Sequence, residues 1–132
     1  MSKTVLIVDD NVHIRRSLRS CIERHGELSV CGEAENGAVA VERVKELRPD
    51  VIILDLQMPV MNGLEAAREI AMIAPEIPMV MLSLHANDEL VHQAKSAGIS
   101  EVISKTEAIP QRLLASLKKL CASRPASLPE SV

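Results

Sequence analysis

The stretch Val51-Ile52-Ile53-Leu54-Asp55-Leu56-Gln57-Met58-Pro59-Val60-Met61-Asn62-Gly63 decides the fold. Its first four residues are apolar and mostly β-branched, which is typical of a strand buried on both faces of a parallel sheet. Pro59 and the Asn62-Gly63 pair then prevent the strand from continuing and predict a loop before the next helix. Asp55 is therefore expected at the carboxyl end of a central strand, the edge where open α/β sheets bind ligands. A lone aspartate in such a place is more often a turn residue.

Length, composition and charge indicate one soluble globular domain. The chain has 132 residues, of which 47% are hydrophobic and 25% charged, and this length is sufficient for one buried core. A formal net charge of −3 favours neither nucleic-acid nor membrane-surface binding. No apolar run approaches the ~20 residues that span a bilayer, and the N-terminus does not resemble a signal peptide. We expect a cytoplasmic protein that binds neither nucleic acid nor membranes directly.

The cysteine and histidine positions argue against a transition-metal site, and the lack of aromatic residues limits what can fill the core. The three cysteines, Cys21, Cys31 and Cys121, have no metal-ligand spacing, and we expect reduced, mostly buried thiols. The histidines share no ligand spacing with cysteines or carboxylates, which argues against a transition-metal site; they are His13, His25, His85 and His92. Phe, Tyr and Trp are absent, so aliphatic residues and six methionines must fill the core.

Four more short segments, 5–8, 28–31, 79–82 and 101–104, are expected to form strands, the second of them short and near an edge. Helical periodicity follows each strand. In the second helical segment, which Pro49 ends, it places Ala40, Val41, Val44 and Leu47 on the inner face. Five strand–helix alternations predict a doubly wound, flavodoxin-like parallel sheet in the order 2-1-3-4-5, with helices on both faces. We assign residues 1–122 to this domain and residues 123–132 to a Ser/Pro-rich tail or linker.

Polar residues follow the strands at the points where they end. In the predicted order, the carboxyl ends of the strands bring together Asp9 and Asp10, Asp55, Ser83 and Lys105. Each residue alone is more often a cap, a turn residue or a solvated charge, but their common position is a stronger signal. Three crowded carboxylates repel one another unless a cation lies among them, and oxygen-only ligands favour Mg²⁺.

These groups are also the ones that phosphoryl transfer requires. A carboxylate such as Asp55 can act as the nucleophile and form an acyl phosphate. Mg²⁺ and Lys105 would offset the charge on the phosphoryl oxygens, and Ser83 would donate a hydrogen bond to one of them.

The motifs Val8-Asp9-Asp10, Asp55 through Met58-Pro59 and Asn62-Gly63, Leu82-Ser83, and Ser104-Lys105 occur in one order along the chain. With these motifs, about residues 3 to 122 resemble a receiver domain of the two-component response regulators, the CheY-like family. Leu82-Ser83-Leu84-His85 and the Thr106 that follows Lys105 are most similar to the NarL/FixJ branch.

The resemblance implies a role for each residue. Asp55 would be the phosphoacceptor for a histidine kinase or phosphotransfer protein of a phosphorelay. Asp9, Asp10, Asp55 and the backbone carbonyl of Gln57 would hold Mg²⁺, while Ser83 and Lys105 would contact the phosphoryl group. Such domains catalyse only their own phosphorylation and dephosphorylation and are classed as signalling proteins. Self-association or output partners would use the face formed by the fourth helix, fifth strand and fifth helix.

Two features depart from the family pattern. Val102 occupies the position of an aromatic residue that usually moves inward on activation, which leaves the readout of the switch open. NarL/FixJ regulators also usually carry a helix-turn-helix domain, and nothing after Lys119 could form one. We therefore expect either a stand-alone receiver or a receiver piece whose linker is the Ser/Pro tail.

Two alternative functions remain open. An inert pseudo-receiver that only binds partners would be consistent with Val102. A haloacid-dehalogenase-type phosphatase also uses an aspartyl nucleophile, but that family resembles Asp-x-Asp, and the second position here is Gln57.

Overall fold

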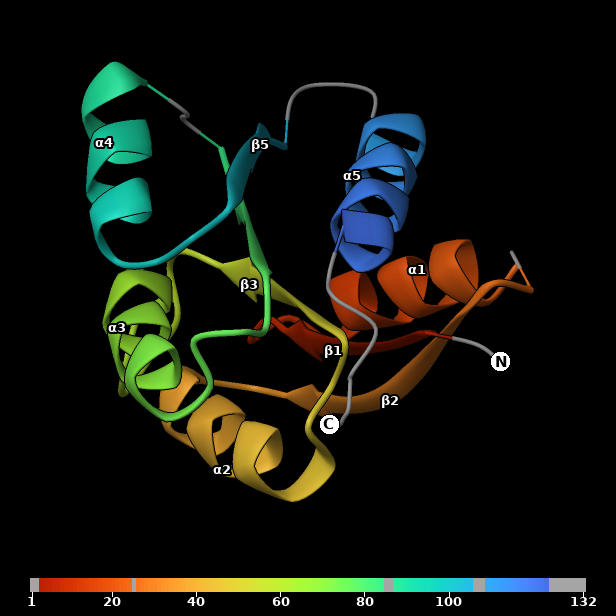
Figure 1. Ribbon diagram of the computed structural model, residues 1–132, viewed down its shortest axis with the longest axis horizontal. Coiled ribbons are helices and arrows are strands. Elements are labelled where there is room, and N and C mark those ends of the chain that lie inside the picture. The colour runs from red at the N-terminus through yellow and green to blue at the C-terminus, as the bar shows by residue number, and fades with distance from the viewer. Residues whose placement is uncertain (1–2, 25, 85–86, 106–108, 124–132) are drawn as a thin grey trace.

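The computed structural model describes residues 3–24, 26–84, 87–105 and 109–123. Within this part of the chain, five strands alternate with five helices (Figure 1). In chain order they are β1 (Lys3–Val8), α1 (Val12–Glu23), β2 (Leu28–Ala34), α2 (Gly37–Leu47), β3 (Val51–Asp55), α3 (Gly63–Ile73), β4 (Met79–Ser83), α4 (Asp88–Ser96), β5 (Glu101–Ser104) and α5 (Ile109–Ser123).

The strands form one sheet in the order β2-β1-β3-β4-β5, and each neighbouring pair is parallel. This confirms the predicted flavodoxin-like order and places β1, β3 and β4 in the middle. Helices α1 and α5 cover one face of the sheet, while α2, α3 and α4 cover the other (Figure 1). The carboxyl ends of the strands therefore meet at one edge between two helical layers.

The alternation of side chains along β3 divides the core into two clusters. Ile52 and Leu54 pack in the cluster beneath α2, α3 and α4, whereas Val51 and Ile53 pack in the cluster beneath α1 and α5. All four side chains are at most 1% exposed. A strand that is covered on both faces needs no polar face, which explains the unbroken apolar run before Asp55.

The second strand is longer than its sequence predicts. It begins at Leu28 as expected, but it continues past Cys31 to Ala34. Val5 pairs with Val30 while Leu6 pairs with Gly32, so Cys31 is the extra residue of a β-bulge. The bulge changes the register within the strand, and the apolar pattern of residues 28–31 therefore does not reveal the pairing of residues 32–34.

In helix α2, one residue that was predicted to lie in the core is partly exposed. Ala40, Val41 and Val44 are buried as expected, but Leu47 is 39% exposed. Leu47 is the last residue of α2, and the chain turns away at Arg48, whose φ is 46°. The Leu47 side chain lies over Gly32 of the edge strand β2, so it packs at the margin of the sheet.

Four of the helices have an asparagine as their N-cap. In each case the side-chain oxygen accepts a hydrogen bond from a backbone N–H of the first helical turn, which satisfies a donor that has no partner within the helix. These N-caps are Asn11, Asn36, Asn62 and Asn87. Each of these caps comes between a strand and the next helix, so all four lie on the side of the sheet where the strands have their carboxyl ends.

Several sequence predictions fall outside the described residues, namely those for His25, His85, Thr106 and residues 124–132. None of the described cysteines forms a disulfide; Cys121 is buried as expected, but Cys21 and Cys31 are partly exposed. Within the described ranges, no helix combines the length and the apolar character that crossing a membrane requires.

The loop between β3 and α3 contains a strained residue. Val60 has a φ of 68°, and Met61 N donates a hydrogen bond of 2.6 Å to Pro59 O across it, which defines a γ-turn. A positive φ is unfavourable for a β-branched residue, and the Val60 side chain is 82% exposed, so little packing offsets the strain. The carbonyl oxygen of Met61, the residue after Val60, accepts a hydrogen bond of 3.0 Å from Gly37 N. The turn therefore connects this loop to the start of α2.

We therefore expect Val60→Gly to stabilise the protein. Glycine removes a left-handed conformational cost of about 1–2 kcal/mol and adds an entropic cost of about 0.5–1 kcal/mol. The net gain of about 1 kcal/mol should raise the melting temperature by about 4 °C, measured by circular dichroism. Val60→Ala, which keeps a Cβ, should gain less. A Val60→Gly protein that melts below wild type would contradict the assignment of strain.

Candidate functional site

Asp9 follows β1 and is held at several points. Its backbone N–H donates to Ala34 O at 3.0 Å, and its Oδ1 accepts a hydrogen bond of 2.9 Å from Asn11 N. The residue is only 2% exposed. Oδ2, in contrast, is a buried side-chain atom without a hydrogen-bond partner in the described structure, and the nearby ammonium of Lys105 is 3.8 Å from it. A buried carboxylate oxygen in this state is costly unless a cation or a donor reaches it.

Asp55 ends β3 and is paired with Lys105, which follows β5. Lys105 Nζ donates a hydrogen bond of 2.7 Å to Asp55 Oδ1, and the Asp55 residue is 7% exposed. The backbone N–H of Lys105 donates to Ser83 O at 2.7 Å, which fixes Lys105 beside the end of β4. Ser83 is 5% exposed and lies opposite Ser104 in the sheet register. The ends of three strands thus bring a carboxylate, a hydroxyl and an ammonium to one place.

Asp9, Asp10 and Asp55 form a carboxylate cluster, in which one oxygen of each lies within 4.8 Å of the others. Asp9 and Asp55 are buried, whereas Asp10 is exposed. Burial raises the pKa of the Asp9 carboxyl; the hydrogen bond from Asn11 opposes this effect, and the charge of Asp55 reinforces it. The net rise in pKa means that the folded protein resists ionisation of Asp9.

The donor atoms of this cluster fit a hard divalent cation. All three residues offer carboxylate oxygens. Among the described residues, this is the group of carboxylate, histidine and cysteine side chains whose ligand atoms lie close enough together to hold a metal ion. Oxygen ligands of this kind suit Mg²⁺, which also retains some of its own water. The Oδ2 atom of Asp9 is buried and accepts no hydrogen bond in the described structure, and its one ion pair, with Lys105, is long at 3.8 Å; a closer positive group would be favourable there. The residues present therefore fit the ion that the sequence predicts.

A cavity of about 410 Å³ opens above the cluster. It is large enough for a phosphoryl group and coordinated water. Its lining includes all of the residues that the sequence predicts for the site. The lining residues are Asp9, Asp10, Asn11, Ile14, Asp55, Leu56, Gln57, Ser83, Leu84 and Lys105. The structure therefore brings the predicted residues together, while the roles assigned to each of them stay predictions.

Backbone contacts hold the β3–α3 loop against this cavity. Leu56 N donates to Leu82 O at 3.3 Å, and Gly63 N donates to Leu56 O at 2.8 Å. A Cβ atom at Gly63 would collide with the backbone carbonyl of Asp55, so the start of α3 approaches β3 more closely than other residues allow. These contacts confine the segment that carries Gln57, the residue whose carbonyl is the predicted fourth ligand.

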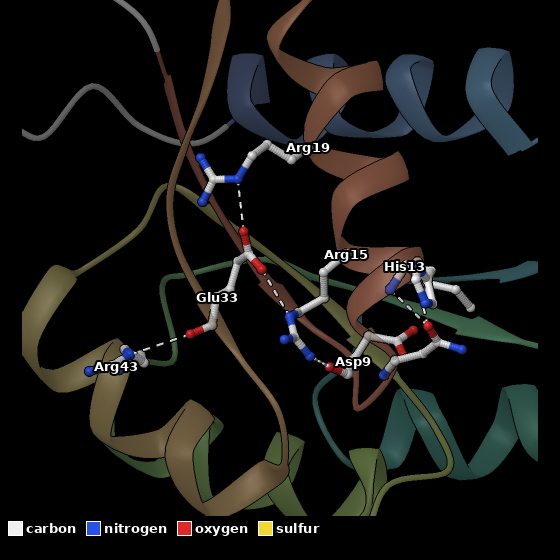
Figure 2. Close-up of polar contacts among 8 residues, drawn as sticks. Asp9, His13, Arg15, Arg19, Glu33 and Arg43 are labelled. Atoms are coloured by element: carbon white, nitrogen blue, oxygen red, sulfur yellow. Dashed lines mark hydrogen bonds and ion pairs between the residues drawn. The ribbon is translucent and has the colours of Figure 1, made fainter.

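Arg15, which the sequence does not mark as a site residue, lies behind the site. Its Nη1 donates a hydrogen bond of 2.6 Å to the backbone carbonyl of Asp9, and its Nε donates to Glu33 Oε1 at 2.9 Å. Figure 2 shows Arg15 lying between these two acceptors. The spacing of Arg15 and Arg19 marks one face of α1 (Val12–Glu23), but only the position of α1 against β2 reveals that this face meets Glu33.

Comparison with known proteins agrees with this geometry. A family model described as "Response regulator receiver domain" matches residues 5–118. The chemotaxis protein CheY of Thermotoga maritima is 40% identical over 120 residues, which cover 91% of this chain and 98% of that protein. The transcriptional regulatory protein YdfI of Bacillus subtilis is also 40% identical, over 101 residues, or 76% of this chain. The matched region spans 47% of YdfI, about half of its length.

Solved structures lead to the same family. The crystal structure of a LuxR-family two-component response regulator from Aurantimonas sp. SI85-9A1 superposes with a TM-score of 0.88. Its sequence identity is 27%, and the match covers 94% of this chain and 88% of that one. The similarity thus includes both chemotaxis and LuxR-type relatives. The family model spans most of the chain. The three carboxylates, Ser83 and Lys105 line one cavity at the carboxyl ends of the strands. The chain belongs to the response regulator receiver domain family.

Proposed function

We propose that this chain is a phosphoacceptor in a two-component phosphorelay, in which Asp55 receives a phosphoryl group from a histidine kinase or phosphotransfer protein. The observation that carries the proposal is the arrangement around Asp55. Its carboxylate lies 2.7 Å from the Lys105 ammonium and within 4.8 Å of two other carboxylates that together suit a divalent cation. Phosphoryl transfer depends mainly on such positioning and charge neutralisation.

The proposed chemistry begins with attack on phosphorus. A carboxylate oxygen of Asp55 forms a bond to the phosphorus of a phosphohistidine, and the P–N bond breaks with its electron pair going to the imidazole. Asp55 then carries an acyl phosphate. In the return step, water attacks the phosphorus, the bond to the Asp55 oxygen breaks, and inorganic phosphate leaves. The chain thus processes only its own phosphoryl group, which makes it a signalling protein rather than an enzyme with an external substrate.

Each neighbouring residue has a proposed part. Lys105 neutralises a phosphoryl oxygen, and the Ser83 hydroxyl donates a hydrogen bond to another. Asp9, Asp10 and Asp55 would hold Mg²⁺ together with the backbone carbonyl of Gln57. The ion, when bound, would neutralise charge on the phosphoryl oxygens and orient them. We place this reaction in the cytoplasm, where histidine kinases have access to ATP.

We further propose that output or self-association uses the face formed by α4, β5 and α5. Val102 of β5 is partly buried and packs against the cluster beneath α2, α3 and α4, opposite Met81 of β4. A β-branched valine has few rotamers and cannot fill the space that a rotating aromatic would fill. The readout on this face therefore depends on backbone movement after Ser83 rather than on a large side-chain rotation.

Asp55 should gain one phosphoryl group when the protein is incubated with acetyl phosphate and Mg²⁺. Intact-mass spectrometry measures the adduct, and its loss on standing measures self-dephosphorylation. Asp55→Asn should show no adduct, because an amide is not a nucleophile of this kind. Excess chelator should prevent adduct formation by wild type.

An adduct of equal yield in Asp55→Asn, or in the presence of chelator, would contradict the proposed site. If wild type forms no adduct, the chain is better described as a pseudo-receiver. If it turns over p-nitrophenyl phosphate catalytically, the phosphatase alternative is correct.

Without divalent ions, Asp9→Asn should raise the melting temperature at neutral pH. Because burial raises the pKa of Asp9 above its usual 3.8, the fold favours the protonated carboxyl. Ionised Asp9 therefore lowers wild-type stability above the raised pKa, and this loss disappears as the pH falls through that pKa towards 3.8. We expect the variant to be more stable than wild type at pH 7, and this gain to be smaller at acid pH.

Added Mg²⁺ should reverse this order of stability. At 100 times its dissociation constant, the ion would stabilise wild type by about 2.7 kcal/mol, and it would stabilise Asp9→Asn much less. Circular dichroism suits the measurement, because the chain has no Trp or Tyr for fluorescence. A variant that is less stable than wild type in chelator, or that gains as much from Mg²⁺, would contradict the assignment of Asp9.

A further inference from the structure

We infer that Arg15 is a positioning residue for the proposed Mg²⁺ site, an inference that rests on the proposed function. Arg15 does not reach the cavity. It bonds instead to the backbone carbonyl of Asp9, at 2.6 Å through Nη1. That carbonyl belongs to the peptide unit that joins Asp9 to Asp10, and a planar peptide moves as one body. Fixing its oxygen therefore fixes the direction in which the chain enters Asp10.

This restraint matters most for Asp10. Asp9 is held independently, because its N–H donates to Ala34 O and its Oδ1 accepts from Asn11 N. Asp10 is exposed and lies outside the regular elements, so the orientation of its backbone decides where its carboxylate points. A ligand that is already oriented loses less entropy when it binds the ion. Arg15 thus supports the exposed carboxylate of the cluster through the main chain.

Glu33 holds Arg15 in place from the edge strand. Its Oε1 accepts from Arg15 Nε at 2.9 Å, and its Oε2 accepts from Arg19 Nε at 2.8 Å. Glu33 lies in β2 opposite Ile7 of β1, so the sheet itself sets its position. Figure 2 shows this chain of contacts from Arg19 through Glu33 and Arg15 to Asp9, with Arg43 contacting the Glu33 backbone. The Arg15 side chain is 16% exposed, so solvent has limited access to it.

The charges of this network make the inference testable. Burial raises the pKa of Glu33, but the hydrogen bonds from Arg19 and Arg15 outweigh burial and lower it overall. Glu33 is therefore ionised and offsets the positive charge behind the site. If Arg15 acted only through its charge, its removal would relieve repulsion and tighten the binding of a cation. If it acts by positioning, its removal weakens binding.

Arg19 provides a matched control. Both arginines bond to Glu33 at nearly equal distances, 2.9 Å and 2.8 Å, and both lie on α1. Arg19 makes no contact with Asp9 in the described structure; its other ion pair, with Glu23 at 3.3 Å, is exposed and contributes little. Arg15→Ala and Arg19→Ala thus each remove one charge and one contact to Glu33, but only the first removes the bond to the Asp9 carbonyl.

The experiment is a calorimetric titration of Mg²⁺ into the full chain, as wild type, Arg15→Ala, Arg15→Lys and Arg19→Ala. We expect Arg15→Ala to weaken binding about 10-fold, the lower end of the range for residues that orient metal ligands. Arg15→Lys keeps the charge but cannot serve two acceptors with one planar fork, so it should also bind more weakly than wild type. Arg19→Ala should stay within about 2-fold of wild type. Melting in chelator reports the stability of each variant separately.

Arg15 variants that bind Mg²⁺ as tightly as wild type, or more tightly, would overturn the positioning role while leaving the proposed function intact. An equal loss in Arg19→Ala would overturn it too, because the effect would then belong to the Glu33 ion pairs. A wild-type protein that binds no Mg²⁺ would overturn both the proposed function and the role of Arg15.

Discussion

Mutual repulsion among three carboxylates at one edge of the sheet is the constraint on which the rest of the structure depends. Asp9 and Asp55 are buried, and one lysine, Lys105, contacts both of them. Such a cluster persists only where the surrounding fold is stable enough to hold it, because unpaired buried charge costs free energy. The fully apolar central strands supply that stability, and the same unfavourable charge would give the proposed Mg²⁺ site its affinity for a cation. Stability and function are thus opposed at this edge.

Much of this arrangement could be predicted because the signals are local. The buried run before Asp55 and the alternation of strands with helices predict the sheet order, and the sheet order brings Asp9, Asp10, Ser83 and Lys105 to Asp55. The features that could not be predicted depend on how strands far apart in the sequence pair with one another. The bulge at Cys31 changes the pairing of β2, and that pairing decides that Glu33 faces Arg15. Leu47 has the right periodicity for the core, but the helix ends there and leaves it partly exposed.

The chain has no aromatic residues, and this restricts how phosphorylation could change the proposed output face. Aliphatic side chains fill both clusters, and the methionines of β4 add to the cluster beneath α2, α3 and α4. Val102 packs against that same cluster and has no ring to rotate. A phosphoryl group on Asp55 would therefore act through short backbone connections, such as the hydrogen bond from Lys105 N to Ser83 O. On the opposite side of the site, the path from Asp9 through Arg15 to Glu33 extends to the edge strand. In the proposed function the first path would serve readout and the second would serve metal affinity, so substitutions should separate the two.

The most direct test of the central claim is a crystal structure with Mn²⁺ and beryllofluoride, which stand in for Mg²⁺ and the phosphoryl group. We expect an anomalous peak for one Mn²⁺ among the carboxylates of Asp9, Asp10 and Asp55. We also expect beryllium bonded to an Asp55 oxygen, with Lys105 and Ser83 in contact with the fluorides. Mn²⁺ at another place, or beryllofluoride on a carboxylate other than Asp55, would contradict the central claim.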